Sequence, residues 1–148
     1  MSISFRTKSF LELSVAELYA ILQLRSEVFV VEQNCVFQDM DYKDQKALHI
    51  LGEYNGKIVA YTRIFKPNDY YEFASIGRVV IAANFRDRKW GNDLMQYSIA
   101  EVAQHFGVSQ ITIGAQLYLK KFYENQGFIV TSDVYLEDDI EHIEMKIL

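Results

Sequence analysis

The sequence predicts a single α+β domain over residues 1–148, with a central mixed, mostly antiparallel sheet flanked by helices. Three observations lead to this fold class. The dipeptide Asn55-Gly56 joins two β-prone segments, which is the strongest short signal for a hairpin, and a second hairpin is expected at the C-terminal end. Between the hairpins, one strand–helix–strand crossover is expected, and such a crossover pairs its strands in parallel. A chain of 148 residues has the length of one domain and can bury a core.

The expected strands share alternating or β-branched apolar residues. They are residues 3–8, 48–54, 57–65, 76–81, 111–113, 128–135 and 140–148. A first helix begins at the capping box formed by Ser14 and Glu17 and is expected to end in the apolar turn 28–31. The central helix starts at Trp90 and closes at a glycine cap, and a short helix over 117–126 follows. The expected order is strand, helix, three strands, helix, strand, helix, two strands.

Charge and composition disfavour several classes of protein. Lys and Arg number 15 against 20 Asp and Glu, so the net charge of −5 argues against nucleic acid as a partner of the surface as a whole. Cys35 is the only cysteine, which rules out an intrachain disulfide and favours a reducing compartment. The N-terminal residues lack the apolar run of a signal peptide, and no segment has the length of a membrane span. We expect a cytoplasmic protein without a nucleic acid or membrane partner.

A basic turn lies between the strand 76–81 and the central helix. It contains Arg86, Arg88 and Lys89, and Gly91 follows at the start of the helix. The free N–H groups and the positive dipole end of a helix start attract anions, and a glycine lets a ligand approach the backbone. The turn is therefore a candidate phosphate site. The alternative is an ordinary strand–loop–helix connection whose basic side chains are solvated.

An acidic, irregular segment over residues 32–46 has the length of a functional loop. Asp39, Asp41 and Asp44 are close enough in sequence to suggest calcium, but the glycine and the terminal glutamate of an EF-hand loop are missing. We therefore expect a solvated loop without a metal ion. Arg25, on an otherwise apolar side of the first helix, is a candidate for a buried ion pair with Asp39 or Asp41 that would support this loop.

Two stretches resemble motifs of the GNAT acetyltransferase superfamily. Residues 86–91, RDRKWG, are similar to its acyl-CoA pyrophosphate loop, Q/R-x-x-G-x-G/A: Arg86 and Gly91 match, whereas Lys89 replaces the middle glycine. Residues 119–128, LKKFYENQGF, are similar to its later motif, aromatic-Tyr-x-x-x-Gly-Phe. Further stretches that resemble the ElaA-like branch of this superfamily are residues 24–33, 49–52, 76–79, 114–116 and 142–143.

The resemblance implies the GNAT fold, acetyl-CoA as the acyl donor, and direct transfer of the acetyl group to an amine. It implies that the central strand splays from residues 111–115 to admit the cofactor, and that an N–H near Val80 polarises the thioester carbonyl. Tyr123 is implied to protonate the departing thiolate as general acid. Backbone pairing with the pantetheine arm is implied for Val79, Val80 and Ile81. Contact with the pyrophosphate is implied for Arg86, Asp87, Arg88, Lys89, Trp90, Gly91 and Asn92, and cofactor contact also for Gln116, Phe122 and Tyr123.

The general base stays open among Glu32, Asp41, His49 and His142. For the two histidines, which both lie in expected strands, a hydrogen-bonded structural role is the favoured interpretation. Cys35 has no partner base identifiable from sequence, so covalent catalysis is not expected. The acidic loop favours a cationic small-molecule or peptide amine as the acceptor.

Two other functions stay open beside acetyl transfer. The first is a non-catalytic acyl-CoA-binding module, because a fold does not guarantee its chemistry. The second is an acyl-homoserine-lactone synthase, which Arg25, Val28 and Phe29 followed by spaced acids resemble, although the chain is short for that family. A homodimer, packed through the closing hairpin and Tyr70-Tyr71, also stays open.

Overall fold

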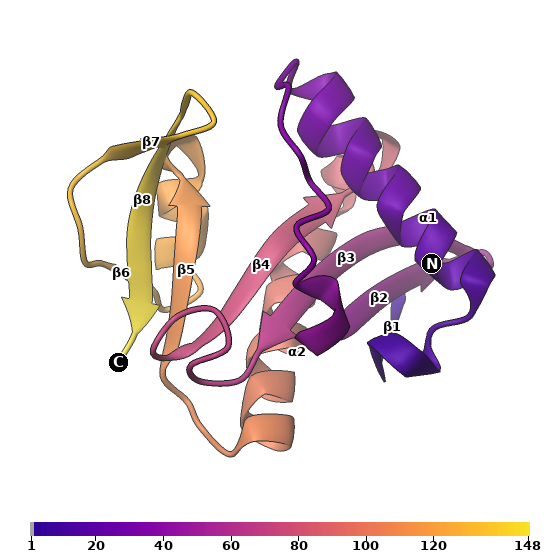
Figure 1. Cartoon of the computed structure of the whole chain (residues 1–148), viewed down its shortest axis with the longest axis horizontal. Helices are drawn as coiled ribbons and strands as arrows, with labels where there is room; N and C mark the ends of the chain where they lie inside the picture. The colour runs from indigo at the N-terminus through magenta and orange to yellow at the C-terminus, as the bar shows by residue number, and fades with distance from the viewer. Residues whose placement is uncertain (1) are drawn as a thin grey trace.

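The computed structural model describes residues 2–148 as one eight-stranded sheet with helices on both of its faces (Figure 1). The strands are β1 (Ser4–Ser9), β2 (Leu48–Tyr54), β3 (Lys57–Phe65), β4 (Ala74–Ile81), β5 (Ile111–Gln116), β6 (Ile129–Val130), β7 (Tyr135–Glu137) and β8 (Ile140–Ile147). The helices are α1 (Val15–Arg25), the π-helix η2 (Ser26–Glu32), α2 (Trp90–Phe106), α3 (Lys120–Glu124), and the 3-10 turns η1 (Phe10–Glu12), η3 (Asp44–Lys46), η4 (Ala83–Arg88) and η5 (Leu117–Leu119). None of these helices within residues 2–148 is long and apolar enough to cross a membrane.

The strand order is β1-β2-β3-β4-β5-β8-β6, and β7 also pairs with β8. Across the part of the chain that the structure describes, the paired strands are antiparallel except β4 and β5, which are parallel because α2 connects them. The predicted mixed, mostly antiparallel sheet is therefore confirmed.

Alternate residues of the central strands build a core on each face of the sheet. Ile50 of β2 packs in a cluster with Leu94 of α2, whereas its neighbour Leu51 packs in another cluster with Ile21 and Leu24 of α1. Successive side chains of a strand point to opposite faces. The helices α1 and α2 therefore cover opposite sides of the same strands.

The first helix ends where the sequence predicts, but the geometry of its last part was not predicted. The apolar turn 28–31 is the last helical turn, as expected, and it belongs to the π-helix η2, which continues α1 directly and runs to Glu32. Val28 is buried and Phe29 packs against the same core, so the apolar run belongs to the packed helix. The N–H of Gln33 donates to the carbonyl of Val28, five residues back, over 3.2 Å. The wider π-turns carry Glu32 and Gln33 to the opening between β4 and β5.

The parallel strands β4 and β5 pair at only two positions and then diverge (Figure 1). Ala74 lies opposite Ile111, and Ser75 lies opposite Thr112. Beyond Ser75, no residue of β5 pairs with β4 in the described chain. The predicted splay of the central strand is confirmed.

A β-bulge in β4 lies beside this divergence. Tyr61 of β3 pairs with Val80 and Arg63 pairs with Gly77, so two steps of β3 face three steps of β4. Arg78 within the bulge has a φ of 51°, in the left-handed region that non-glycine residues rarely adopt. Bulges bend a strand and strengthen its twist. This bulge accordingly helps to turn β4 away from β5.

The closing hairpin differs from its prediction in one strand. Residues 128–135 do not form one strand, because β6 covers only two residues and β7 starts at Tyr135. Between them, the hydroxyl of Ser132 accepts a hydrogen bond from the N–H of Glu144 over 2.9 Å, replacing a backbone partner and letting the chain leave the sheet edge. The hairpin itself is formed by β7 and β8 through Asp138 and Asp139, whose φ values of 50° and 63° suit a tight turn.

Candidate active site

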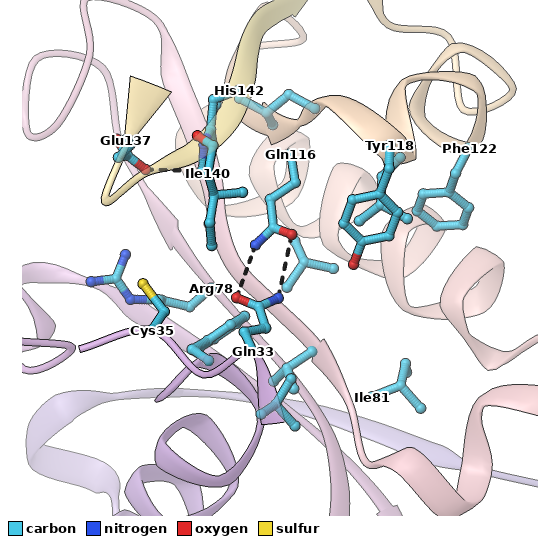
Figure 2. A pocket seen from close by; sticks show the side chains of 18 of the residues that line it. Gln33, Cys35, Arg78, Ile81, Gln116, Tyr118, Phe122, Glu137, Ile140 and His142 are labelled. Atoms are coloured by element: carbon cyan, nitrogen blue, oxygen red, sulfur yellow. Dashed lines mark hydrogen bonds and ion pairs between the residues drawn. The ribbon is translucent and has the colours of Figure 1, made fainter. Parts of the chain in front are cut away.

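The divergence of β4 and β5 opens a cavity of about 490 Å³. Its wall comes from the end of η2, the strands β4 and β5, the region of η5 and α3, and the β7–β8 turn. In Figure 2, the side chains of Gln33 and Gln116 face one another across this cavity. Their amides exchange two hydrogen bonds of 3.3 Å each. This amide pair divides the wall into two parts.

One part of the wall, which we call the α2 side, contains Ile81, Tyr118 and Phe122 (Figure 2). The other part, which we call the hairpin side, contains Cys35, Arg78, Glu137 and His142 (Figure 2). Arg86 belongs to the α2 side because its Nε donates to the carbonyl of Ile81 over 3.0 Å. Gly91 belongs there too, since a side chain at this position would meet the ring of Phe122 at 3.5 Å.

Most of the predicted site residues meet in this wall. Those that line the cavity are Val79, Val80, Ile81, Arg86, Gly91, Gln116, Phe122 and Tyr123. The predicted residues that lie in the turn beside the cavity are Asp87, Arg88, Lys89, Trp90 and Asn92. Segments far apart in the sequence thus converge at the start of α2.

Lys89 sets the geometry of the helix start. It is the N-cap of α2 with a φ of 61°, a left-handed conformation that glycine adopts without steric strain. For a residue with a side chain, this conformation costs about 1–2 kcal/mol. The side chain of Lys89 makes no capping hydrogen bond, so the first amides of α2 have no side-chain acceptor from their N-cap. The helix start therefore has the donors that an anion requires.

Arg86 reaches from the basic turn to the end of η2. Its guanidinium pairs with both carboxylate oxygens of Glu32, through Nη2 at 2.9 Å and through a second, shorter contact of Nη1. The hydrogen bond from Arg86 is the main cause of a lowered pKa of Glu32. An anionic ligand at Arg86 has to compete with this carboxylate, and Glu32 is a poor base while it is so paired.

Arg88 packs on aromatic rings. Its guanidinium carbon lies 5.1 Å from the ring centroid of Tyr54, 4.9 Å from that of Phe85 and 5.2 Å from that of Trp90. Such cation–π contacts hold a guanidinium while leaving its N–H groups for other partners. Arg88 is therefore fixed at the turn.

Tyr123 is at the C-terminal end of α3 and is 5% exposed. Its ring makes edge contacts with Phe122 and Phe128, whose centroids lie 5.1 and 6.0 Å away. Burial, helped by the neighbouring Tyr118, raises the pKa of the Tyr123 hydroxyl well above its ordinary value. At neutral pH, this hydroxyl is therefore protonated.

A backbone amide beside Val80 faces the cavity. The N–H of Ala82 donates to the carbonyl of Val59 in β3 over 2.8 Å. Because hydrogen-bonded pairs alternate along an antiparallel ladder, the preceding amide, that of Ile81, points away from β3 and toward β5. The edge of β4 that diverges from β5 therefore presents a donor to the cavity.

Comparison with known proteins identifies the family. A family model for the acetyltransferase (GNAT) domain matches residues 15–148. The chain belongs to the GNAT acetyltransferase family. It is 46% identical to the protein ElaA of Escherichia coli K12 over 136 residues, which cover 90% of this chain and 89% of ElaA. This places it in the ElaA-like branch, as its motifs predict.

Solved GNAT structures have the same fold. The crystal structure of an acyl-CoA N-acyltransferase from Pseudomonas aeruginosa is 36% identical with a TM-score of 0.94, and the match covers 99% of this chain and 100% of that chain. The crystal structure of Escherichia coli ElaA superposes with a TM-score of 0.91 at 43% identity, covering 98% of this chain and 99% of that one. The acyl-homoserine-lactone synthase LasI, at 12% identity and a TM-score of 0.81, shares the fold alone; the match covers 99% of this chain and 89% of LasI. The GNAT domain and these neighbours support acyl transfer as the general activity.

Arg25 of this GNAT chain is fully buried between two carboxylates. Its Nε donates to Asp39 and its NH1 donates to Asp44, each over 2.8 Å. The predicted pair with Asp39 is confirmed. The alternative pair with Asp41 is wrong, because Asp41 instead binds Arg63, at 2.6 and 2.9 Å. The loop is held by ion pairs, so its acids are not simply solvated as expected.

Two arginines of this network lie within strands and are not predicted from the sequence. Arg63 also donates to Asp44 at 2.9 Å, and Arg78 donates to Asp39 at 2.7 Å. Burial by itself would raise the pKa of Asp41, but the hydrogen bonds and charge of Arg63 lower it well below its ordinary value. Asp41 is therefore an ionised ion-pair partner and a poor base.

His49 is fully buried and hydrogen-bonded through both ring nitrogens, which confirms its predicted structural role. Nε2 lies 2.9 Å from the carbonyl of Asp44, which can only accept, so Nε2 carries the proton. Nδ1 then accepts from the hydroxyl of Tyr61 at 2.6 Å. Burial is the main cause of a lowered pKa of His49, which keeps the ring neutral.

Among the residues of the cavity wall that received no site role from the sequence are Gln33, Tyr118 and Glu137. Gln33 ends the ElaA-like stretch 24–33 without a role of its own, Tyr118 carries no motif, and Glu137 was expected only as part of a turn. Arg63 and Arg78 carry a usable signal, because a charged residue inside an apolar strand has to find a buried partner. The partner itself cannot be named from spacing alone.

Proposed function

We propose that this protein transfers an acetyl group from acetyl-CoA to an amine by direct attack. The observation that carries the proposal is the cavity between β4 and β5, into whose wall the edge of β4, the start of α2 and Tyr123 all converge. The first provides backbone hydrogen bonds, the second an anion site and the third a proton donor. These are the three requirements of acyl transfer from a thioester bound through a diphosphate.

The α2 side is the proposed place of the cofactor. The backbone of Val79 to Ile81 is unpaired toward β5 and can pair with the two amide groups of pantetheine, as an added strand does. The amides from Arg86 to Asn92 bind the diphosphate at the helix start, with charge from Arg88 and Lys89. Arg86 joins them once it releases Glu32.

The proposed chemistry needs no covalent enzyme intermediate. The lone pair of the uncharged amine attacks the thioester carbon, and the developing oxyanion receives a hydrogen bond from the amide next to Val80. The new C–N bond forms, the C–S bond breaks, and the hydroxyl of Tyr123 gives its proton to the thiolate. A base takes one proton from the amine nitrogen, so the products are an acetamide and CoA thiol. The proposed acceptor is a cationic small-molecule or peptide amine.

Calorimetric titration with acetyl-CoA tests the cofactor, and release of CoA thiol in the presence of a panel of amines tests the reaction. We expect saturable binding that Arg86→Ala and Arg88→Ala weaken. Arg6→Ala is a matched control, because Arg6 loses the same charge but pairs with Glu17 and Glu53, away from the cavity. Binding that Arg86→Ala and Arg88→Ala weaken no more than Arg6→Ala does would contradict the assignment of the helix start.

A non-catalytic acyl-CoA-binding module is the second candidate. It is favoured by the ion pairs of Glu32 with Arg86 and of Asp41 with Arg63, which leave neither carboxylate free to act as the base. Tight acetyl-CoA binding without thiol release from any amine of the panel would support this candidate over acetyl transfer.

A further inference from the structure

The structure removes three of the four residues considered as the general base. Glu32 is paired with Arg86, and Asp41 is paired with Arg63. His49 is buried and uses both ring nitrogens in hydrogen bonds. None of the three can take a proton from an amine without giving up the partner that holds it.

His142 is held differently. It lies in β8 opposite Gln116 of β5, lines the hairpin side of the cavity, and its side chain is 8% exposed. Nδ1 is 2.7 Å from the carbonyl oxygen of Ile140, and a carbonyl can only accept a hydrogen bond. Nδ1 therefore carries the proton of the neutral ring. The lone pair is left on Nε2.

The surroundings of Nε2 suit a group that gains a proton. The carboxylate of Glu137 is 3.4 Å away, and this contact is attractive only once Nε2 is protonated. The ring of Tyr135 stacks on the imidazole, with centroids 5.9 Å apart and an angle of 28°. Glu137 is 56% exposed, so its help to the imidazolium is screened by solvent. Glu137 is therefore placed to orient the ring of His142, as a positioning residue.

Few other ionisable groups lie near this pair. Burial is the main cause of a raised pKa of Tyr135, so its hydroxyl stays uncharged at neutral pH. The thiol of Cys35 is 3.4 Å from the carbonyl of Asp138 at the turn. Arg78 lies on β4, across the cavity from this pair, and donates hydrogen bonds from its Nε to the carboxylate of Asp39 and from its Nη2 to the carbonyl of Asp39. Among the residues that line the cavity, the acidic side chains at this end are those of Glu137 and Asp138. Glu144 and Tyr70 lie outside this lining but close enough to Tyr135 to help raise its pKa.

We propose that His142 is the general base of acetyl transfer and that the hairpin side of the cavity receives the acceptor as a protonated primary amine. This inference rests on the proposed function. Glu137 and Asp138 attract the ammonium group, which first gives one proton to the solvent and so exposes the lone pair that attacks the thioester carbon. As or after the C–N bond forms, a second proton passes from the nitrogen to Nε2 of His142. The donor occupies the α2 side, so the two substrates meet near the pair formed by Gln33 and Gln116.

The sharpest variant is His142→Asn. The amide nitrogen of asparagine can keep the hydrogen bond to Ile140, whereas nothing replaces Nε2. We expect kcat for thiol release, with acetyl-CoA and the best amine of a panel of spermidine, lysine amide and short peptides, to fall by about 10²- to 10⁴-fold. The dissociation constant of acetyl-CoA should stay within about twofold, because donor and base lie on different sides of the cavity. Thermal unfolding of each variant reports whether it folds.

The pH profile separates a base from a merely structural histidine. In the wild type, we expect kcat to rise with pH along a limb that belongs to His142 and that His142→Asn abolishes. Glu137→Gln should move this limb to lower pH, since the imidazolium loses a neighbouring carboxylate. The matched controls are His105→Gln and Glu141→Gln, which change exposed side chains that do not line the cavity and should leave the limb in place.

A measurement that needs no turnover is the ring ¹⁵N spectrum of histidine-labelled protein, with the signals of His142 assigned by their loss in His142→Asn. We expect the neutral Nδ1–H tautomer, and a neutral Nε2–H tautomer would overturn the inference. An intact rising limb in a folded His142→Asn protein would also overturn it, while acetyl transfer itself would stand. Binding of acetyl-CoA without acetylation of any amine would overturn the proposed function, and the role of His142 with it.

Discussion

The ion pair between Glu32 and Arg86 makes a quantitative prediction about cofactor binding. In the structure, the carboxylate of Glu32 binds the guanidinium of Arg86, which we propose as a contact of the pyrophosphate. Replacing Glu32 by Gln removes the competing charge but keeps a side chain of similar size. Arg86 remains positioned, because its Nε still donates to the carbonyl of Ile81 over 3.0 Å. Glu32→Gln should therefore bind acetyl-CoA more tightly than the wild type.

The size of the effect follows from the exposure of the pair. The side chains of Arg86 and Glu32 are 41% and 40% exposed, so the pair belongs to the solvent-screened class. Such pairs contribute about 0.2–1 kcal/mol. With 1.36 kcal/mol per factor of ten, the affinity for acetyl-CoA should rise about 1.4- to 5-fold. The gain should shrink at high salt, because ions screen exposed charges.

Isothermal titration calorimetry at low and high ionic strength measures this gain. Glu27→Gln is the matched control, since it makes the same charge change on the same helix at a residue that does not line the cavity. Any general benefit of a less acidic protein toward an anionic ligand appears in both variants. An affinity of Glu32→Gln equal to or below that of Glu27→Gln would refute the competition. In an Arg86→Ala background, Glu32→Gln should bring no gain, because the two changes act on one contact.

Four further predictions concern activity and stability. Tyr123→Phe should lower kcat for thiol release by about 100-fold or more, with the acetyl-CoA affinity within about twofold, and an unchanged kcat would exclude Tyr123 as the acid. Lys89→Gly should raise the free energy of unfolding, measured in urea, by between 0 and about 1 kcal/mol. Glycine removes the steric cost of the left-handed conformation, but it loses more conformational entropy on folding. A clear loss of stability would contradict strain at this position. Asp44→Asn should destabilise by about 3 kcal/mol in the same assay, since it leaves the buried Arg25 short of a charge, and a loss below about 1 kcal/mol would contradict this. The N–H of Ser14 donates a hydrogen bond to the carboxylate of Glu17, and this is the main reason why the pKa of Glu17 is lowered to about 2. The ionised carboxylate therefore stabilises the folded protein fully above the ordinary pKa of 4.5, and this stabilisation should be lost as the pH falls from there toward 2. Urea titrations at several pH values measure the loss.

The fold could be predicted because its strongest signals are local. The dipeptide Asn55-Gly56 turns the chain by its own backbone preferences, and the hairpin of β2 and β3 follows. The N–H of Glu17 donates to the hydroxyl of Ser14 over 3.0 Å, as the capping box requires. Each of these interactions lies within four residues of sequence. The hairpin and the start of the first helix could therefore be predicted without knowledge of the tertiary packing.

The departures from the expected elements arise where distant residues decide. The last part of the first helix packs Val28 and Phe29 against the core, and there the helix has π geometry that was not expected. The expected strand over residues 128–135 is interrupted where the hydroxyl of Ser132 satisfies a backbone N–H of β8. Periodicity in the sequence does not report such contacts.

The segments that line the candidate site could be predicted from the sequence, whereas the ion pairs between their side chains could not. The motifs around Arg86 and Tyr123 identified segments that the structure brings into one cavity wall, and their roles stay predictions. The contact of Arg86 with Glu32 joins residues far apart in sequence, so no local spacing indicates it. The same holds for the choice of Asp44 over Asp41 as a partner of Arg25, because both acids lie on one loop and only the register of the fold selects between them.

The buried ion network explains how the loop and the bulge stay in register. One carboxylate, that of Asp39, accepts from Arg25 of α1 at 2.8 Å and from Arg78 of the β4 bulge at 2.7 Å. A buried ion pair adds little net stability over apolar packing, but it tolerates few alternative geometries because an unpaired charge is so unfavourable. Arg78 also has the strained backbone of the bulge that helps to open the cavity. We infer that Asp39 couples the position of α1 and its loop to the opening of β4 away from β5, so the structural charges of this chain lie where the cavity needs a fixed shape.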